Sequence, residues 1–250
     1  MNRRVGMGWM AAMLLAAGVR GGEAANPILE KFADAVTFYV SYDEGDGAPM
    51  MAAGKADVRN KDREPQAVPG ILGQGMMGGG YGYFSEKNVD LSAPGTVVLW
   101  IALRDKEKEA YAWPIRIATD RGMVIFGRQP GPRVYMHADA PKGADGKALE
   151  GKAPFYHSIN GIGGFKDWGD GWHMLAFTWD AENAGISVDG AAPSEKALPE
   201  PLDGASSWFT TGMPDNAMDE LAILNRKLTA EELKWLYDET LARAKAVDGK

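Results

Sequence analysis

Short apolar segments alternate with turns rich in glycine and proline along most of the chain. The segment 96–103 is apolar at consecutive positions, as in a strand that is covered on both faces. Other segments rich in β-branched and aromatic residues predict strands at 36–42, 113–118, 123–126, 133–138, 173–179, 186–188 and 218–224. Many short strands of this kind predict an all-β sandwich.

The stretches between these strands are polar or rich in glycine. Residues 48–70 are polar and irregular, which predicts a loop. Residues 70–84 hold many glycines but lack the lysine and the following helix of a phosphate-binding loop, so we expect a strand with a tight glycine turn. Residues 139–171 are predicted to form a long loop, which is one place where function could reside.

One helix is predicted before the first strand and one after the last. Asn26 and Pro27 have the residue types of an N-cap and a first-turn position. Thr229 and Glu232 have the spacing of a capping box. The apolar residues that follow share one helical face, which we expect to pack on the sandwich: Leu233, Leu236, Tyr237 and Leu241. The opposite face is acidic, which disfavours a membrane-surface helix.

The N-terminal segment has the features of an export signal. Arg3 and Arg4 precede an apolar stretch at 5–19, and small residues follow at Gly22 and Ala24. A spanning helix needs roughly 20 apolar residues, so cleavage is favoured over a retained membrane anchor. We therefore expect residues 1–25 to be a signal peptide, 26–250 to be the mature domain, and the protein to be secreted or periplasmic, with no stable membrane insertion after cleavage.

Composition excludes several classes of chemistry. The 250 residues include no cysteine, which excludes disulfides, thiolate zinc sites and cysteine nucleophiles. The net charge is −7 and no basic run is present, which disfavours nucleic acid and anionic membrane surfaces as partners.

Four segments in order carry a resemblance to a known family. They are a strand ending in an acidic turn (38–45), a glycine strand and a Gly-Thr-apolar-Trp strand (73–76, 94–100), a Trp-His strand leading to a Val-Asp-Gly hairpin (171–190), and a terminal strand plus helix (218–237). The chain resembles the laminin-G-like, concanavalin A-like lectin-glucanase family, particularly its bacterial exported members. The resemblance implies a two-sheet antiparallel jelly-roll sandwich, here with a short N-terminal helix and a C-terminal helix.

The resemblance also implies one structural calcium near the first and last strands. Asp219 matches the position that supplies a carboxylate there, and Asp43 is a second candidate metal ligand. Calcium prefers several oxygen ligands, which glycine-rich turns also offer. The alternative is that Asp219 caps a turn or pairs with Arg226 or Lys227.

The family's fold hosts lectins, adhesion modules and glycosidases, so the fold alone does not decide function. Glycoside hydrolysis needs two carboxyl groups flanking the bond, and the Glu-x-Asp-x-x-Glu strand of related hydrolases is not found here. Asp219 and Glu220 are adjacent, so on a strand they are expected to point to opposite faces. The sequence therefore assigns no catalytic residue.

Candidate ligand-binding residues are aromatic and polar side chains outside the expected core. Arg133, Tyr135 and His137 alternate on one strand and so share a face, where they either line a ligand groove or simply face solvent. In the long loop, Tyr156 and Trp168 are selected as platforms on which a sugar ring could stack. The weaker aromatic candidates are Tyr81, Tyr83, Trp113, Phe155 and Trp208.

Three functional hypotheses follow. The first is an exported, non-catalytic binding module, with a glycan as the ligand. The second is a structural or adhesion domain that contacts a cell-envelope protein. The third is a glycoside hydrolase whose site these motifs miss.

Overall fold

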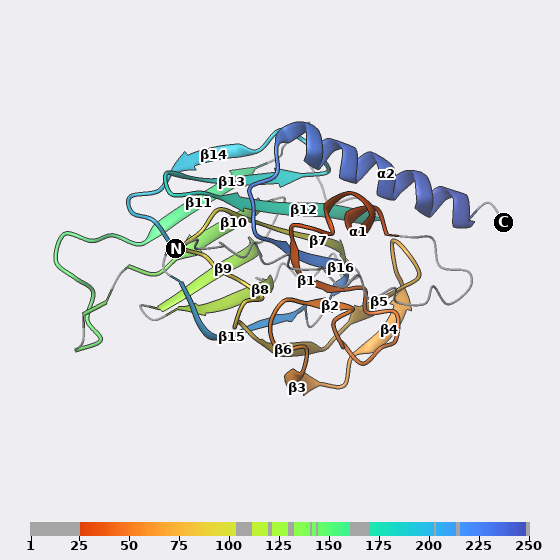
Figure 1. Ribbon diagram of the computed structural model, residues 1–250, viewed down its shortest axis with the longest axis horizontal. Helices are drawn as coiled ribbons and strands as arrows, with labels where there is room; N and C mark the ends of the chain where they lie inside the picture. The colour runs from red at the N-terminus through yellow and green to blue at the C-terminus, as the bar shows by residue number, and fades with distance from the viewer. Residues whose placement is uncertain are drawn as a thin grey trace, which may run out of the picture.

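The computed structural model describes residues 26–248 except 104–111, 120–121, 130–132, 141, 144, 161–170, 203 and 214–215. In these residues two antiparallel sheets pack face to face, and two helices lie outside one of them (Figure 1). This is the predicted jelly-roll sandwich with an N-terminal and a C-terminal helix. Neither helix of the described chain is long and apolar enough to cross a membrane.

The first sheet has nine strands in the order β14-β13-β12-β7-β16-β1-β2, with β5 pairing with β16 and β4 with β5. Its strands are β1 (Val36–Val40), β2 (Met51–Ala52), β4 (Gln66–Pro69), β5 (Gln74–Met77), β7 (Gly95–Leu103), β12 (Trp172–Trp179), β13 (Asn183–Val188), β14 (Ser194–Ala197) and β16 (Asn216–Leu224).

The second sheet has seven strands in the order β11-β10-β9-β8-β15-β6-β3. Its strands are β3 (Val58–Arg63), β6 (Gly80–Phe84), β8 (Ala112–Thr119), β9 (Gly122–Gln129), β10 (Arg133–Ala138), β11 (Phe155–Asn160) and β15 (Ala205–Gly212).

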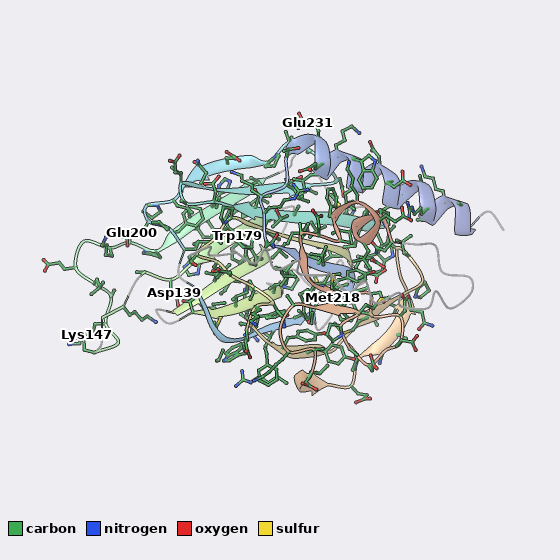
Figure 2. All side chains as sticks on the ribbon, in the orientation of Figure 1. Asp139, Lys147, Trp179, Glu200, Met218 and Glu231 are labelled. Carbon is green, nitrogen blue, oxygen red and sulfur yellow. The ribbon has the colours of Figure 1, made fainter. Side chains whose placement is uncertain are left out.

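The main core lies between the two sheets. Alternate side chains of each strand point inward, and Phe126 of one sheet packs against Phe177 and Trp179 of the other. Figure 2 shows Trp179 and Met218 in the middle of the molecule, between the layers. Burial of each such large apolar side chain contributes roughly 1.5–3 kcal/mol, so this layer dominates the stability of the fold.

A second core forms on the outer face of the nine-stranded sheet, under helices α1 (Pro27–Phe32) and α2 (Ala230–Asp248). The predicted stripe of α2 supplies Leu233 and Leu236, which are buried against the sheet, and Tyr237, which stacks on Trp100 of β7. The capping box is present, because Thr229 accepts from the Glu232 amide and Glu232 accepts from the Thr229 amide. The helices therefore cover one side of the sandwich only.

The predicted loops at 48–70 and 139–171 were partly wrong. β2, β3 and β4 lie in the first, and β11 lies in the second. Strands β14 and β15 were also missed. Most of these strands lie at or near sheet edges, where one or both faces are exposed, so they lack the apolar alternation on which a strand prediction depends.

Candidate ligand-binding face

The outer face of the seven-stranded sheet is the sheet surface that neither described helix covers. Both helices pack on the opposite side of the molecule, over β7, β12 and β16 (Figure 1). Four large hydrophobic side chains of the described residues are exposed, and two of them, Trp113 and Tyr156, belong to strands of this sheet. This face is therefore where a ligand can reach ordered aromatic side chains.

The predicted residues of β10 do lie on this face. Val134 and Met136 point into the core between the sheets, so Arg133, Tyr135 and His137 point outward. Tyr156 of β11 stands directly opposite His137 in the antiparallel register and shares its face. The structure thus brings four of the five predicted ligand-binding residues together, and the fifth, Trp168, lies outside the described residues.

Tyr135 is only 5% exposed although it points away from the core. Its ring stacks on the ring of Tyr156, with 5.7 Å between centroids and 26° between planes. It also lies over Gly127 of the neighbouring strand, where a Cβ atom would come within 2.6 Å of the ring. The glycine makes room for Tyr135, and Tyr135 in turn supports Tyr156, which is 37% exposed.

A continuous row of directly paired residues crosses this face from β11 to β6. The row is Tyr156, His137, Ile125, Arg116, Thr210 and Gly82. Neighbouring strands are about 4.8 Å apart, so the row is roughly 24 Å long. That length suits an extended ligand better than a single small ring.

Two aromatic rings beside this row each lie under an arginine. The Arg116 guanidinium lies 5.8 Å from the centre of the Trp113 ring, and the Arg59 guanidinium lies 5.4 Å from that of Trp208. Trp113 shares the face of Arg116 because the register of β8 shifts between Ala112 and Ile115. The sequence included both tryptophans only as weak candidates, and a bulge that reorients Trp113 has no clear sequence signal.

Three other aromatic candidates are not available to a ligand. Tyr81 and Tyr83 are fully buried in the inter-sheet core, and their hydroxyl groups donate to the carbonyl oxygens of Gly45 and Gly47. Phe155 is also buried, because it opposes the inward-facing Ala138. The sequence predicted a strand with a tight glycine turn at 70–84, and the alternation of β6 turns both tyrosines inward.

The three histidines occupy separate environments. His137 lies on the open face, 3.9 Å from the Asp139 carboxylate. His157 is buried, and its Nε2 lies 2.7 Å from the Ser194 carbonyl oxygen, so it links the edge strands β11 and β14 of the two sheets. His173 Nδ1 lies 2.8 Å from the Asp189 carboxylate, on the nine-stranded sheet.

The two candidate metal ligands, Asp219 and Asp43, hold the same turn. Asp219 Oδ2 accepts from the Ile71 and Leu72 amides at 2.8 and 3.3 Å, and its Oδ1 accepts from the Glu220 amide at 2.9 Å. Asp43 Oδ1 accepts from the Gln74 amide at 2.7 Å. Carboxylates bonded to backbone amides in this way act as turn caps, which is the alternative that the sequence left open for Asp219.

The donors around Asp219 do not fit a calcium ion well. Three N–H groups already point at its two oxygens, and an N–H group and a cation compete for the same lone pairs. Within the part of the chain that the structure describes, no group of three or more His, Asp or Glu side chains could hold a metal ion. Calcium stays a prediction from the resemblance.

Asp219 and Glu220 do not follow simple strand alternation. The register of β16 shifts between Asp219 and Ala222, and Glu220 has a φ of 53°. Because of this bulge, Met218 and Leu221 both point into the inter-sheet core. Burial raises the pKa of Asp219 well above its usual range, and the charge of Glu220 raises it further. Glu220 accepts from the Tyr39 hydroxyl at 2.6 Å, so it too is part of a buried network.

A small hollow of about 40 Å³, partly open to solvent, lies at one end of the sandwich. Apolar side chains of β9, β10 and β11 line it together with Asp139 and Glu200, which Figure 2 shows at the same end of the molecule. Asp139 accepts from the Met123 amide at 3.1 Å, and Glu200 pairs with Lys152. Through Asp139 this hollow adjoins the His137 end of the row.

The comparison with family models agrees with this architecture. The model of the concanavalin A-like lectin/glucanases superfamily, Laminin_G_3, matches residues 77–234, which is more than half of the chain. The chain belongs to this superfamily. The match runs from β5 into α2, so it includes every strand that carries the row on the open face. No curated protein matches the sequence.

Solved structures share this fold at low identity. The binding domain of botulinum neurotoxin serotype D matches with a TM-score of 0.61 and 11% identity, over 82% of this chain and 52% of that one. The binding domain of Paraclostridial Mosquitocidal Protein 1 matches with a TM-score of 0.60 and 14% identity, over 82% and 52%. The chain therefore spans about half the length of these toxin domains.

A shorter solved structure matches over nearly its whole length. Domain 4 of AbnA, a GH43 extracellular arabinanase from Geobacillus stearothermophilus, solved in complex with arabinotriose, has a TM-score of 0.56 and 16% identity. The match covers 81% of this chain and 98% of that domain. At these identities the likeness shows the fold alone.

Proposed function

We propose that the protein is an exported, non-catalytic binding module whose ligand is a carbohydrate, held on the outer face of the seven-stranded sheet. The observation that carries the proposal is the placing of two exposed aromatic side chains, Trp113 and Tyr156, on the one sheet that the described helices leave uncovered. Each of these side chains offers a ligand a large aromatic surface with a polar edge.

The chemistry of the row suits a sugar chain. Sugars present C–H faces that pack on aromatic rings and hydroxyl groups that both donate and accept hydrogen bonds. Tyr156 and Trp113 offer rings, while His137, Arg116 and Thr210 offer polar atoms between them. Tyr135 is fixed between Gly127 and Tyr156, so part of the surface is ordered before binding and less conformational entropy is lost.

Two further points support the proposal. The superfamily includes lectins by name, and the arabinanase domain of the same fold was solved with arabinotriose bound. The basic and apolar pattern of residues 1–25 supports export. Recovery of the mature protein with residues 1–25 intact would contradict the export part.

A glycan array on the domain 26–250 tests the binding part. We expect Tyr156→Ala and Trp113→Ala each to weaken binding to the glycans that the wild type retains. The matched control is Met50→Ala, since Met50 is 60% exposed and precedes β2 of the other sheet. A blank array, together with capture of a cell-envelope protein that Met50→Ala abolishes and Tyr156→Ala does not, would contradict the proposal and favour the adhesion alternative.

A further inference from the structure

Two arginines of the open face are held differently from two arginines of the helix side. On the helix side, Arg226 forms two hydrogen bonds with Glu232, and Arg243 pairs with Glu30 and Glu239. Carboxylates neutralise those guanidinium groups.

Arg116 and Arg59 instead lie over Trp113 and Trp208, and within the described residues neither pairs with a carboxylate. An aromatic ring positions a cation without cancelling its formal charge. These two charges are therefore fixed in place and available to a ligand.

Six of the seven strands of this sheet lack acidic residues. β6, β8, β9, β10, β11 and β15 contain no aspartate or glutamate, and their outward-facing side chains include Arg116, Arg133 and His137. The edge strand β3 contains Asp62 among the basic residues Arg59, Lys61 and Arg63. The chain as a whole carries 34 acidic against 27 basic residues, so these six strands differ from the overall composition. A polyanion that would be repelled by most of the surface meets no carboxylate on these six strands.

Within the described residues, carboxylate groups lie near both ends of this face. Asp139 lies 3.9 Å from His137 at the β10 end, and Glu86 lies 3.5 Å from Lys55, whose ammonium group stands 4.8 Å over the Phe84 ring at the other end. The carboxylates of Glu232, Glu30 and Glu239 lie on the helix side, beyond both sheets, where arginines neutralise them. The local charge of the face therefore decides which ligand it accepts.

We infer that the ligand on this face is an anionic polysaccharide, carrying carboxylate or sulfate groups along an extended chain. This inference rests on the proposed function and names its substrate class. Arg116 stands in the middle of the row of Tyr156, His137, Ile125 and Thr210, where a guanidinium can form paired hydrogen bonds with a carboxylate or sulfate. The aromatic rings around it pack on the sugar faces, so the site requires both the charge and the ring.

Calorimetric titration of the domain 26–250 tests the inference with defined probes. The probes are an oligogalacturonate, its fully methyl-esterified form, a sulfated galactan oligosaccharide and an oligothymidylate of matched charge. We expect the oligogalacturonate, the sulfated oligosaccharide or both to bind, and which of them binds identifies the anionic group. The esterified chain is expected to bind at least tenfold more weakly, because it cannot form charge-assisted hydrogen bonds.

Two variants locate the charge. Arg116→Gln is expected to lower the affinity for the anionic probe about tenfold or more. Lys234→Gln removes the same charge from the exposed surface of α2, where Lys234 pairs with Asp238, and is expected to leave the affinity unchanged. Thermal melts of both variants confirm that each is folded.

The possible failures can be told apart. If the esterified chain binds as well as the acid, and Arg116→Gln changes nothing while Tyr156→Ala still abolishes binding, the ligand is a neutral glycan and only the inference on charge fails. If oligothymidylate binds as tightly as the sugars, the face recognises charge alone and the inference is overturned. If no saccharide binds, neutral or anionic, both the inference and the proposed function fail.

Discussion

Gly127→Ala is predicted to disturb the aromatic pair of the open face and to lower the stability of the domain. A methyl group at this position would have its carbon 2.6 Å from Cζ of Tyr135. Carbon atoms pack at about 3.5–4.0 Å, so the ring must move by roughly 1 Å. Tyr135 is confined between Gly127 and Tyr156, so the movement is transmitted to the exposed ring that we expect to contact the ligand.

The magnitude follows from two opposing terms. Crowding a well-packed side chain costs about 1–3 kcal/mol. Replacing a glycine inside a strand with alanine recovers about 0.5–1 kcal/mol of backbone entropy. The net prediction is a loss of about 0.5–2 kcal/mol in the free energy of unfolding, together with weaker ligand binding. Urea unfolding measures the first effect as a lower midpoint at unchanged slope.

A control and a double variant isolate the ring contact. Gly204→Ala adds a methyl group where no atom lies within 4 Å, so it should not lower the stability. In a Tyr135→Ala background the clash is absent, and Gly127→Ala should then be neutral or stabilising. An equal loss of stability in both backgrounds would refute the reasoning, because the cost would lie in the backbone and not in the ring.

Four other predictions concern the helix side and the turn. Leu233→Ala should cost about 2–5 kcal/mol in urea unfolding, since the side chain is fully buried under α2, and a cost below 1 kcal/mol would show that the helix is loosely attached. Thr229→Ala should cost about 1 kcal/mol through loss of the cap. The hydrogen bonds from Arg226 hold the pKa of Glu232 below its usual range. The stability that the Glu232 carboxylate contributes to the fold is therefore present above about pH 4.5 and is lost as the pH falls through the lowered pKa. The loss of thermal stability caused by Glu232→Gln should therefore become smaller in melts recorded at acid pH. A difference between wild type and variant that stays the same at every pH would contradict this. EDTA should leave the melting temperature unchanged, since amides satisfy Asp219; a calcium-induced rise that Asp219→Ala abolishes would instead establish the metal site.

The parts of the fold that the sequence predicted are those where burial is strongest. The strand 96–103, the Trp-His strand and the terminal strand with its capped helix are apolar at the positions that pack, so their pattern alone identifies them. β3 and β14 have polar sequences, Val-Arg-Asn-Lys-Asp-Arg and Ser-Glu-Lys-Ala, because they are edge strands of their sheets. No periodicity distinguishes such strands from loops.

The candidate site was predicted only as far as a single strand allows. Alternation placed Arg133, Tyr135 and His137 on one face, and the structure agrees. Arg116 could not be added from the sequence, because it reaches the same row through strand pairings between residues far apart in the chain. The arrangement of cations over aromatic rings likewise depends on the sheet order, which the sequence alone does not give.

The most direct measurement of the central proposal uses the indole N–H signals of the tryptophans. The ¹H–¹⁵N spectrum of the tryptophan-labelled domain is recorded while a saccharide that binds is added. The signals of Trp113 and Trp208, beside the row on the open face, should shift in proportion to occupancy, and that of Trp235 on α2 should not. Shifts at Trp235 with none at Trp113 and Trp208 would contradict the proposal that the seven-stranded sheet is the binding surface.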